Sequence, residues 1–132
     1  MPLVRIDLSA ERDNAQAIAD GVHQALVDSI GIPATDRFQI LTRHPAAELI
    51  ADPSYLGVQR HDVVFVQISL VGGRPTDLKV ALYRRIAEVL APLGVRGDDL
   101  FVTLTENGLA DWSVGNGEAQ LLGLGTVPGL PT

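Results

Sequence analysis

One pattern constrains the fold more than any other feature: a strand, a helix and a second strand follow one another, and the same order then repeats. Alternating apolar and polar residues predict the strands, and apolar residues at helical spacing predict the helices. The predicted elements are strands over about residues 2–8, 37–42, 63–70 and 100–105 and helices over about residues 10–30 and 76–93. The 132 residues therefore predict a single domain of the α+β class, in which duplicated β-α-β halves, about 1–62 and 63–132, form a four-stranded sheet with two helices on one face.

One face of the predicted sheet is left without a covering layer. The strand over residues 63–70 is nearly apolar on both sides, which is typical of a central strand with both faces buried. Two helices cover one face only, so we expect a second subunit to cover the other. The segment from Gly115 onward is too apolar for a solvated tail, and we expect it to pack against the sheet or a neighbouring subunit. Its large apolar residues are Leu121, Leu122, Leu124, Val127 and Leu130.

Composition excludes several classes of function. The chain has no cysteine, which rules out disulfides, thiol catalysis and zinc–thiolate sites. Its net charge of −6 argues against a nucleic-acid partner. No apolar stretch reaches the length of a membrane span and no targeting segment opens the chain, so we expect no membrane partner and a cytoplasmic protein. The three histidines are scattered, and no spacing of histidines and carboxylates predicts a metal site.

Pro2 is the first candidate for a catalytic residue. A methionine that precedes a small residue is the usual substrate of methionine aminopeptidase, and removal of Met1 would leave the secondary amine of Pro2 at the start of the chain. Such an amine is a better nucleophile than a primary amine and, with a tuned pKa, can act as a base or an acid. Because a strand is predicted to begin at this residue, its nitrogen would be held in place where most chain ends fray. If Met1 is retained, the nitrogen of Pro2 is an amide and this chemistry is not available.

Four short motifs, spread over nearly the whole chain, carry a resemblance to a known family. They are residues 2–8, residues 32–39 (IPATDRFQ), the Gly72-Gly73-Arg74 turn with Lys79 in the following helix, and residues 105–108 (TENG) continuing through Asp111-Trp112-Ser113. In order and spacing these motifs resemble the tautomerase superfamily, and within it the malonate semialdehyde decarboxylase group. The resemblance implies a homotrimer built on mixed four-stranded sheets, with an N-terminal proline at the end of each active-site cavity.

The resemblance also implies roles for individual residues. It implies an enzyme that acts on small 2-oxo or 3-oxo acids without a metal or an organic cofactor, so that its partner is a small carboxylate substrate. The catalytic residues would be Pro2, Asp36 and Arg74. Arg74 would bind the substrate carboxylate through its guanidinium fork, and Asp36 would act as an accessory acid or base or orient a water molecule. Trp112, the single tryptophan, would form an apolar wall in contact with the substrate.

Several activities of this superfamily stay open from the sequence. Some members of the decarboxylase group carry two arginines separated by one residue, whereas the matching positions here are Gly72 and Arg74. We expect an enzyme like malonate semialdehyde decarboxylase that can also catalyse keto–enol tautomerisation. The alternatives are a hydratase or dehalogenase of 3-haloacrylate-type acids, to which Glu118 could contribute, and a non-catalytic trimeric binding protein of the same fold. The protonation state of Pro2 also stays open, because Asp36 and Arg74 act on it in opposite senses.

Overall fold

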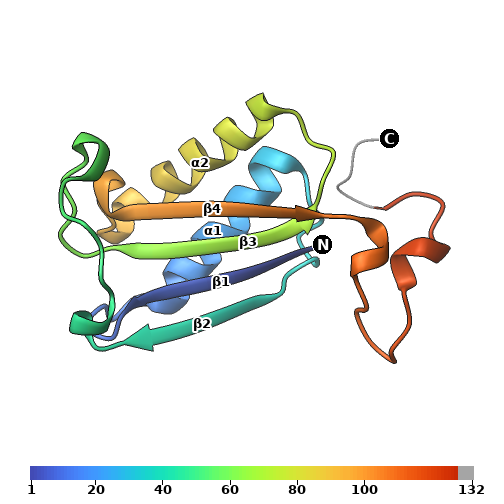
Figure 1. Cartoon of the computed structure of the whole chain (residues 1–132), viewed down its shortest axis with the longest axis horizontal. Coiled ribbons are helices and arrows are strands. Elements are labelled where there is room, and N and C mark those ends of the chain that lie inside the picture. The colour runs from blue at the N-terminus through green and yellow to red at the C-terminus, as the bar shows by residue number, and fades with distance from the viewer. Residues whose placement is uncertain (128–132) are drawn as a thin grey trace.

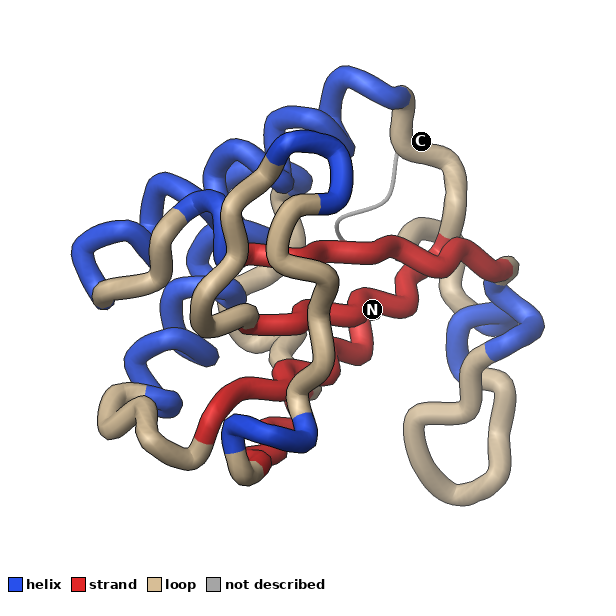
Figure 2. Tube along the Cα trace, turned by 60° about the vertical axis from the view of Figure 1, so that its left-hand side comes forward, coloured by secondary structure: helices blue, strands red, loops and turns tan. Residues whose placement is uncertain are grey.

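The computed structural model describes residues 1–127 and contains a four-stranded sheet covered by two helices (Figure 1). The strands are β1 (Pro2–Ser9), β2 (Gln39–His44), β3 (Val64–Val71) and β4 (Leu100–Asn107), and the helices are α1 (Ala15–Ile30) and α2 (Thr76–Leu90). Short 3₁₀ turns lie in the connections, at Ala46–Glu48, Tyr55–Gly57, Ala91–Leu93, Gly97–Asp99, Leu109–Asp111 and Gln120–Gly123. Both helices pack on the same face of the sheet, as the sequence predicts (Figure 1 and Figure 2).

The order of the strands joins the two halves of the chain through their first strands. The sheet runs β2-β1-β3-β4. β1 pairs in parallel with β2, and β3 pairs in parallel with β4, so each half is a β-α-β unit whose helix connects its two strands. The antiparallel pairing of β1 with β3 places Pro2 opposite Leu70. The sheet is therefore mixed, with β1 and β3 at its centre, which confirms the predicted fold class and the central position of β3.

The helix-facing side of the sheet forms the core. Because successive side chains of a strand point to opposite faces, every second residue of β1 turns toward the helices. These residues are Val4, Ile6 and Leu8, and all three are buried. Their neighbours on β3 are also buried, with Val66 opposite Ile6 and Ile68 opposite Val4. The helices add the buried residues Ile18, Val22 and Leu26 of α1 and Leu82, Ile86 and Leu90 of α2.

The start of α1 differs from the prediction. The helix begins at Ala15 and not near Ala10, because the chain first makes a turn in which the Arg12 amide donates to the Ser9 carbonyl at 3.1 Å. Ser9 does not cap the helix. Its hydroxyl accepts a hydrogen bond from the Glu11 amide instead, so it stabilises the turn that delays the helix.

The end of α2 and the start of β2 also differ from the prediction. α2 ends at Leu90 and continues as a 3₁₀ turn, because the ring of Pro92 would clash with the preceding turn of an α-helix and offers no amide hydrogen. β2 begins at Gln39, later than predicted. The residue two positions before it, Arg37, is held toward α1 by an ion pair with Asp20 at 2.6 Å.

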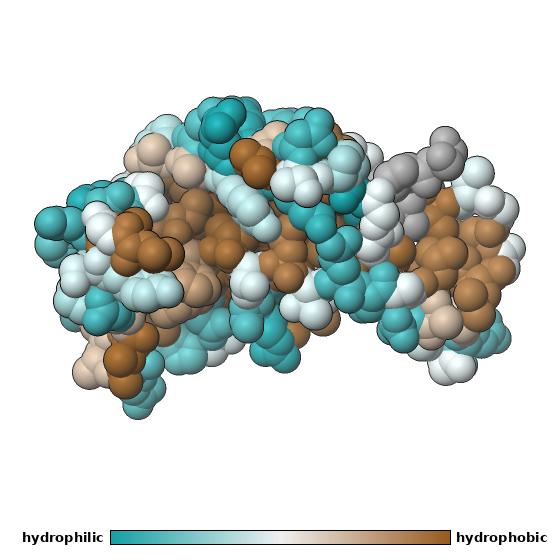
Figure 3. All heavy atoms as spheres, turned by 45° about the horizontal axis from the view of Figure 1, so that its top comes forward, coloured by the Kyte–Doolittle hydropathy of each residue, from teal (hydrophilic) through white to brown (hydrophobic). Residues whose placement is uncertain are grey.

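The segment after β4 leaves the sheet and forms one end of the molecule, at the right of Figure 1. Leu121 is buried, as expected of a tail that packs against the rest of the chain, whereas Leu122 and Leu124 are 61% and 50% exposed. Figure 3 shows the apolar surface that gathers on this segment. Leu130, which the sequence analysis grouped with these residues, lies outside the described part of the chain.

The second face of the sheet has no covering layer within residues 1–127. Arg5 and Gln67 stand exposed on it, so within a single chain β3 is buried on one face, and burial of its other face requires the second subunit that the sequence predicts. Phe101 is 46% exposed and packs against Phe65, with the ring centroids 5.4 Å apart. The exposed phenyl surface gives this face an apolar area that a second subunit could cover. Neither helix of the described chain has the length and apolar content needed to cross a membrane.

The core contacts of α2 give a prediction for stability. Leu82 is fully buried, whereas Val80 on the same helix is 44% exposed. We expect Leu82→Ala to lower the free energy of unfolding by about 2–5 kcal/mol, because it removes buried methyl groups and leaves a cavity. Val80→Ala is the matched control and should lower it by less than about 1 kcal/mol. Urea denaturation at a single protein concentration, followed by circular dichroism, measures both changes; equal losses would contradict the burial of Leu82.

Candidate active site

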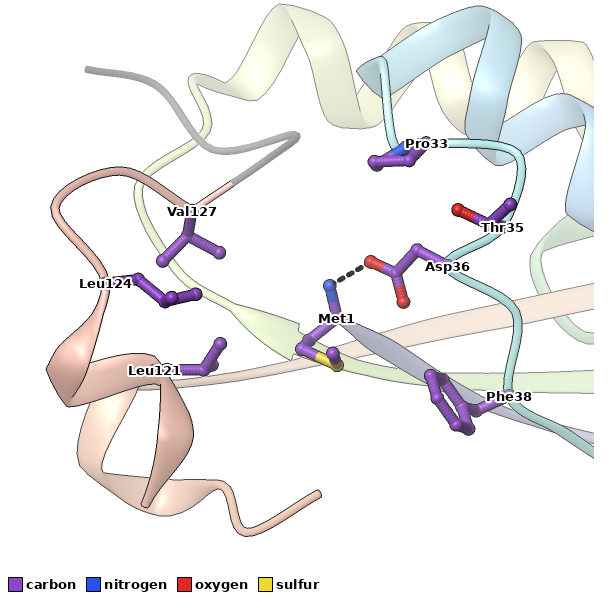
Figure 4. Close-up of a pocket in the computed structure, with 8 residues that line it drawn as sticks. All are labelled: Met1, Pro33, Thr35, Asp36, Phe38, Leu121, Leu124 and Val127. Atoms are coloured by element: carbon purple, nitrogen blue, oxygen red, sulfur yellow. Dashed lines mark hydrogen bonds and ion pairs between the residues drawn. The ribbon is translucent and has the colours of Figure 1, made fainter. Parts of the chain in front are cut away.

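The start of the chain lies beside an acidic side chain at one end of the sheet. Pro2 is buried and is the first residue of β1. The ammonium group of Met1 forms an ion pair with the carboxylate of Asp36, which belongs to the loop between α1 and β2 (Figure 4). The side chains of Met1 and Asp36 are 18% and 11% exposed. The first nitrogen of the chain is thus held by a carboxylate in a mostly enclosed position.

The loop that carries Asp36 is held against α1. The helix ends at Gly31, whose φ of 71° is a left-handed conformation that favours glycine. The amide of Asp36 donates to the Pro33 carbonyl at 3.0 Å. His23 of α1 is buried and donates from Nε2 to the Ala34 carbonyl at 2.8 Å. One oxygen of Asp36, Oδ1, is buried and has no hydrogen-bond partner within residues 1–127.

Arg74 comes to the same end of the sheet from the other half of the chain. It is buried, with 8% of its surface exposed, and its Nη1 donates to the Val71 carbonyl at 3.0 Å. Val71 directly follows Leu70, the β3 residue that pairs with Pro2. Burial lowers the pKa of the Arg74 guanidinium, while the charges of Glu106 and Asp36 act to raise it. The structure therefore brings Pro2, Asp36 and Arg74 together at one end of the sheet.

A second ion pair stands next to Arg74. Lys79 of α2 forms a short ion pair with Glu106 near the end of β4. The pKa of the Glu106 carboxyl is lowered, chiefly by the hydrogen bond from Lys79 and further by the Gly73 amide and the charge of Arg74. Both residues lie in the sequence motifs described above, but no role was predicted for either. Their opposite charges were the only available signal, because they are far apart in the chain.

A cavity of about 300 Å³ opens beside the start of the chain (Figure 4). Most of its lining is apolar, and Asp36 is the only carboxylate that lines it among residues 1–127. The lining residues are Met1, Pro33, Thr35, Asp36, Phe38, Leu121, Leu124 and Val127. The sequence analysis did not assign Phe38 to the site, although it lies in the same motif as Asp36. The apolar pattern of the tail predicted that Leu121 and Leu124 would pack, but not that they would line this cavity.

Trp112 does not line this cavity within the described chain. It follows the 3₁₀ turn Leu109–Asp111, and its indole Nε1 donates to the Asn107 side chain at 2.7 Å. Its predicted contact with the substrate stays a prediction. Within the same range, no cluster of three or more histidine, aspartate or glutamate residues could hold a metal ion.

Comparison with known proteins agrees with this geometry. Two family models, both described as tautomerase enzyme, match residues 2–59 and residues 36–115. The chain belongs to the tautomerase family. The probable tautomerase YusQ of Bacillus subtilis (strain 168) is 38% identical to this tautomerase over 126 residues, which cover 92% of this chain and 99% of YusQ.

Solved structures show the same relationship. The malonate semialdehyde decarboxylase FG41, inhibited by 3-bromopropiolate, is 45% identical to this tautomerase, with a TM-score of 0.88 over 95% of this chain and 99% of that one. A second malonate semialdehyde decarboxylase is 34% identical, with a TM-score of 0.84 over 92% of this chain and 96% of that one. A fused 4-OT that forms a symmetric trimer is 29% identical, with a TM-score of 0.75 over 92% and 99% of the two chains. These similarities extend over more than nine tenths of this chain.

The ion pair between Lys79 and Glu106 gives a prediction for titration. We expect Lys79→Met to raise the pKa of Glu106, because it removes the hydrogen bond that lowers this pKa most. Lys79→Arg keeps a cation and should leave the pKa low. Since the folded-state pKa lies below the ordinary value, the ion pair stabilises the protein at neutral pH, and this contribution is lost as the pH falls through the folded-state pKa. The chemical shift of the Glu106 carboxyl carbon, followed by NMR against pH, measures this pKa in the wild type and in both variants. An equal pKa of Glu106 in Lys79→Met and Lys79→Arg would contradict the proposed effect of the ion pair.

Proposed function

We propose that this tautomerase acts on small oxo acids without a cofactor and that the secondary amine of Pro2, freed by removal of Met1, is its catalytic group. The observation that carries the proposal is the position of Pro2, which is buried and directly follows the residue whose ammonium pairs with Asp36. Loss of Met1 moves the terminal nitrogen to Pro2, which is buried at the start of a central strand. A reactive amine needs such a position, because its geometry is held by the sheet and its surroundings exclude most water.

Arg74 is proposed to bind the carboxylate of the substrate. A guanidinium presents two parallel N–H groups to a carboxylate, and burial strengthens this interaction. The positive charge of Arg74 favours the neutral amine of Pro2, whereas the negative charge of Asp36 favours the ammonium. Asp36 also has an oxygen with no partner in the described chain, which suits it to orient a water molecule or to exchange a proton.

We propose malonate semialdehyde as the substrate and decarboxylation as the reaction, with keto–enol tautomerisation as a second activity. Two decarboxylases of this aldehyde acid, at 45% and 34% identity, support this choice. In one route the Pro2 amine adds to the aldehyde and water leaves. The resulting iminium accepts the electron pair of the breaking carbon–carbon bond, and carbon dioxide departs. Protonation and hydrolysis then yield acetaldehyde and return the amine. In the other route the Pro2 ammonium donates a hydrogen bond to the carbonyl and stabilises the enolate that forms.

A hydratase activity toward 3-haloacrylate-type acids is the second candidate. The structures of the relative at 34% identity address its decarboxylase and hydratase activities together, and they include a proline-to-alanine variant of its first residue. In this tautomerase the unpartnered oxygen of Asp36 favours activation of water. Addition of water to the carbon–carbon double bond of a 3-haloacrylate, followed by loss of hydrogen halide, yields malonate semialdehyde. Release of halide therefore identifies this activity, while conversion of added malonate semialdehyde to acetaldehyde and carbon dioxide identifies the first.

A homotrimer is the assembly that we propose. The fused 4-OT at 29% identity is a symmetric trimer. In this tautomerase the open face of the sheet carries the exposed side chains of Arg5, Gln67 and Phe101, which a neighbouring subunit would cover. Closed rotational symmetry would bury this face in every subunit and leave no sheet face open.

The role of Pro2 gives a prediction that depends on the state of the N-terminus. We expect intact-mass spectrometry to show that Met1 is absent, and 3-bromopropiolate to inactivate the protein and leave a covalent adduct on Pro2. Pro2→Ala also permits removal of Met1 and replaces the secondary amine with a primary one. This variant should lose most of the decarboxylation of malonate semialdehyde, followed as acetaldehyde released.

Borohydride trapping separates the two routes. Treatment with borohydride during turnover should leave a stable adduct on Pro2 if an iminium forms, and none if Pro2 acts as an acid. A protein without Met1 that turns over neither malonate semialdehyde nor phenylenolpyruvate would rule out the enzymatic function and favour the non-catalytic binding protein.

The role of Arg74 gives a prediction for the substrate carboxylate. We expect Arg74→Gln to raise KM for malonate semialdehyde by roughly 10- to 100-fold, because a charge-assisted hydrogen-bonded pair is lost. Arg74→Lys keeps the charge but not the fork and should raise KM less. Arg84→Gln, at an exposed arginine of the same helix region, is the matched control and should behave as the wild type. An unchanged KM in Arg74→Gln would show that the carboxylate binds elsewhere.

A further inference from the structure

Glu106 lies beside the turn that carries Arg74, and the function proposed above gives it no task. It stands near the end of β4, opposite Leu70 in the parallel register with β3. The carbonyl of the next residue, Asn107, accepts a hydrogen bond from the Gly72 amide at 2.9 Å. The turn and the end of β4 are therefore tied together by their backbones, with the Glu106 side chain next to the turn.

The carboxylate of Glu106 occupies the space over Gly72. A methyl group on Gly72 would lie 2.9 Å from Oε2 of Glu106 and 3.5 Å from its Cβ. The first distance is shorter than real side chains tolerate, so a larger residue at position 72 would displace the carboxylate. Gly72 and Glu106 are thus matched: the absence of a side chain at one position makes room for the acid at the other.

Glu106 is bound on several sides by the turn and by α2. Lys79 forms its ion pair, the Gly73 amide donates to it, and the charge of Arg74 stabilises it. These contacts keep the carboxylate ionised at neutral pH. They also mean that the charge of Lys79 is largely cancelled before any substrate arrives.

The charges at this end of the sheet nearly balance. Arg74 and Lys79 stand with two carboxylates, Asp36 and Glu106, and a protonated terminal amine brings their formal sum to +1. One carboxylate of a substrate neutralises this sum. A second carboxylate would add a negative charge to a site that already holds the charge of Glu106, which costs binding energy in a partly buried position.

We propose that Glu106 is a specificity-determining residue that restricts the site to monocarboxylates, by cancelling the charge of Lys79 beside the turn that carries Arg74. This inference rests on the proposed function, because it places the substrate carboxylate at Arg74. It adds to that function a residue that selects the charge of the ligand and does not itself take part in the reaction.

The test compares a dicarboxylate with a monocarboxylate of similar size. Malonate and propionate are titrated into the protein at neutral pH and constant ionic strength, and their Kd values are measured by NMR. We expect the wild type to bind propionate at least as tightly as malonate. Glu106→Gln keeps the size of the side chain and its hydrogen-bond acceptor but raises the formal charge by one, and it should shift the ratio of the two Kd values toward malonate by roughly tenfold.

Two further variants separate charge from structure. Lys79→Gln lowers the formal charge and should shift the ratio toward propionate. The double variant with Lys79→Gln and Glu106→Gln restores the charge sum and should return the ratio to the wild-type value, which a merely structural role for Glu106 does not predict. Glu11→Gln, at an exposed residue beyond the far end of β1, is the matched control and should leave the ratio unchanged.

The outcomes distinguish this inference from the proposed function. If both acids bind and Arg74→Gln weakens them, but the ratio stays the same in Glu106→Gln and Lys79→Gln, the role of Glu106 is overturned and the proposed function stands. If neither acid binds to the wild-type protein without Met1, the carboxylate site itself is wrong and this inference falls with it.

Discussion

The antiparallel pairing of β1 with β3 is the interaction on which the rest of the structure depends. It joins the two β-α-β halves at the centre of the sheet and places Pro2 opposite Leu70. Arg74 follows β3 after a short turn, so the same pairing brings it to the start of the chain. A shift of the register by one residue would turn the buried side chain of Val4 to the open face. Burial of the core residues therefore fixes the strand register that brings Pro2 and Arg74 to the same end of the sheet.

The candidate site combines partly buried ion pairs with an apolar cavity. Asp36 pairs with the first nitrogen of the chain and Glu106 pairs with Lys79, so each of these two cations has a carboxylate partner. The tail supplies apolar side chains such as Leu121 to the cavity. Asp36 lines this cavity, and the apolar walls around it strengthen its interaction with a charged group relative to an open surface.

Much of the architecture could be predicted from the sequence, and part of the site could not. The alternation in strands and the helical spacing predicted every strand and both helices, with errors of a few residues where Ser9 and Pro92 impose local turns. The motifs predicted that Asp36 and Arg74 would accompany Pro2, and the structure brings all three together. The pairing of Glu106 with Lys79 left no trace in any spacing, because it depends on how α2 packs beside β4.

The sequence by itself determined the order of the elements, the apolar faces of the strands and helices, and which residues could carry amine and carboxylate chemistry. These follow from local preferences that neighbouring residues express without the rest of the chain. Only the tertiary structure decided which distant groups meet: the terminal nitrogen with Asp36, and Glu106 with the space over Gly72. Contacts of this kind depend on strand register and on the path of the loops. Both are set by the packing of the whole core and not by any single segment.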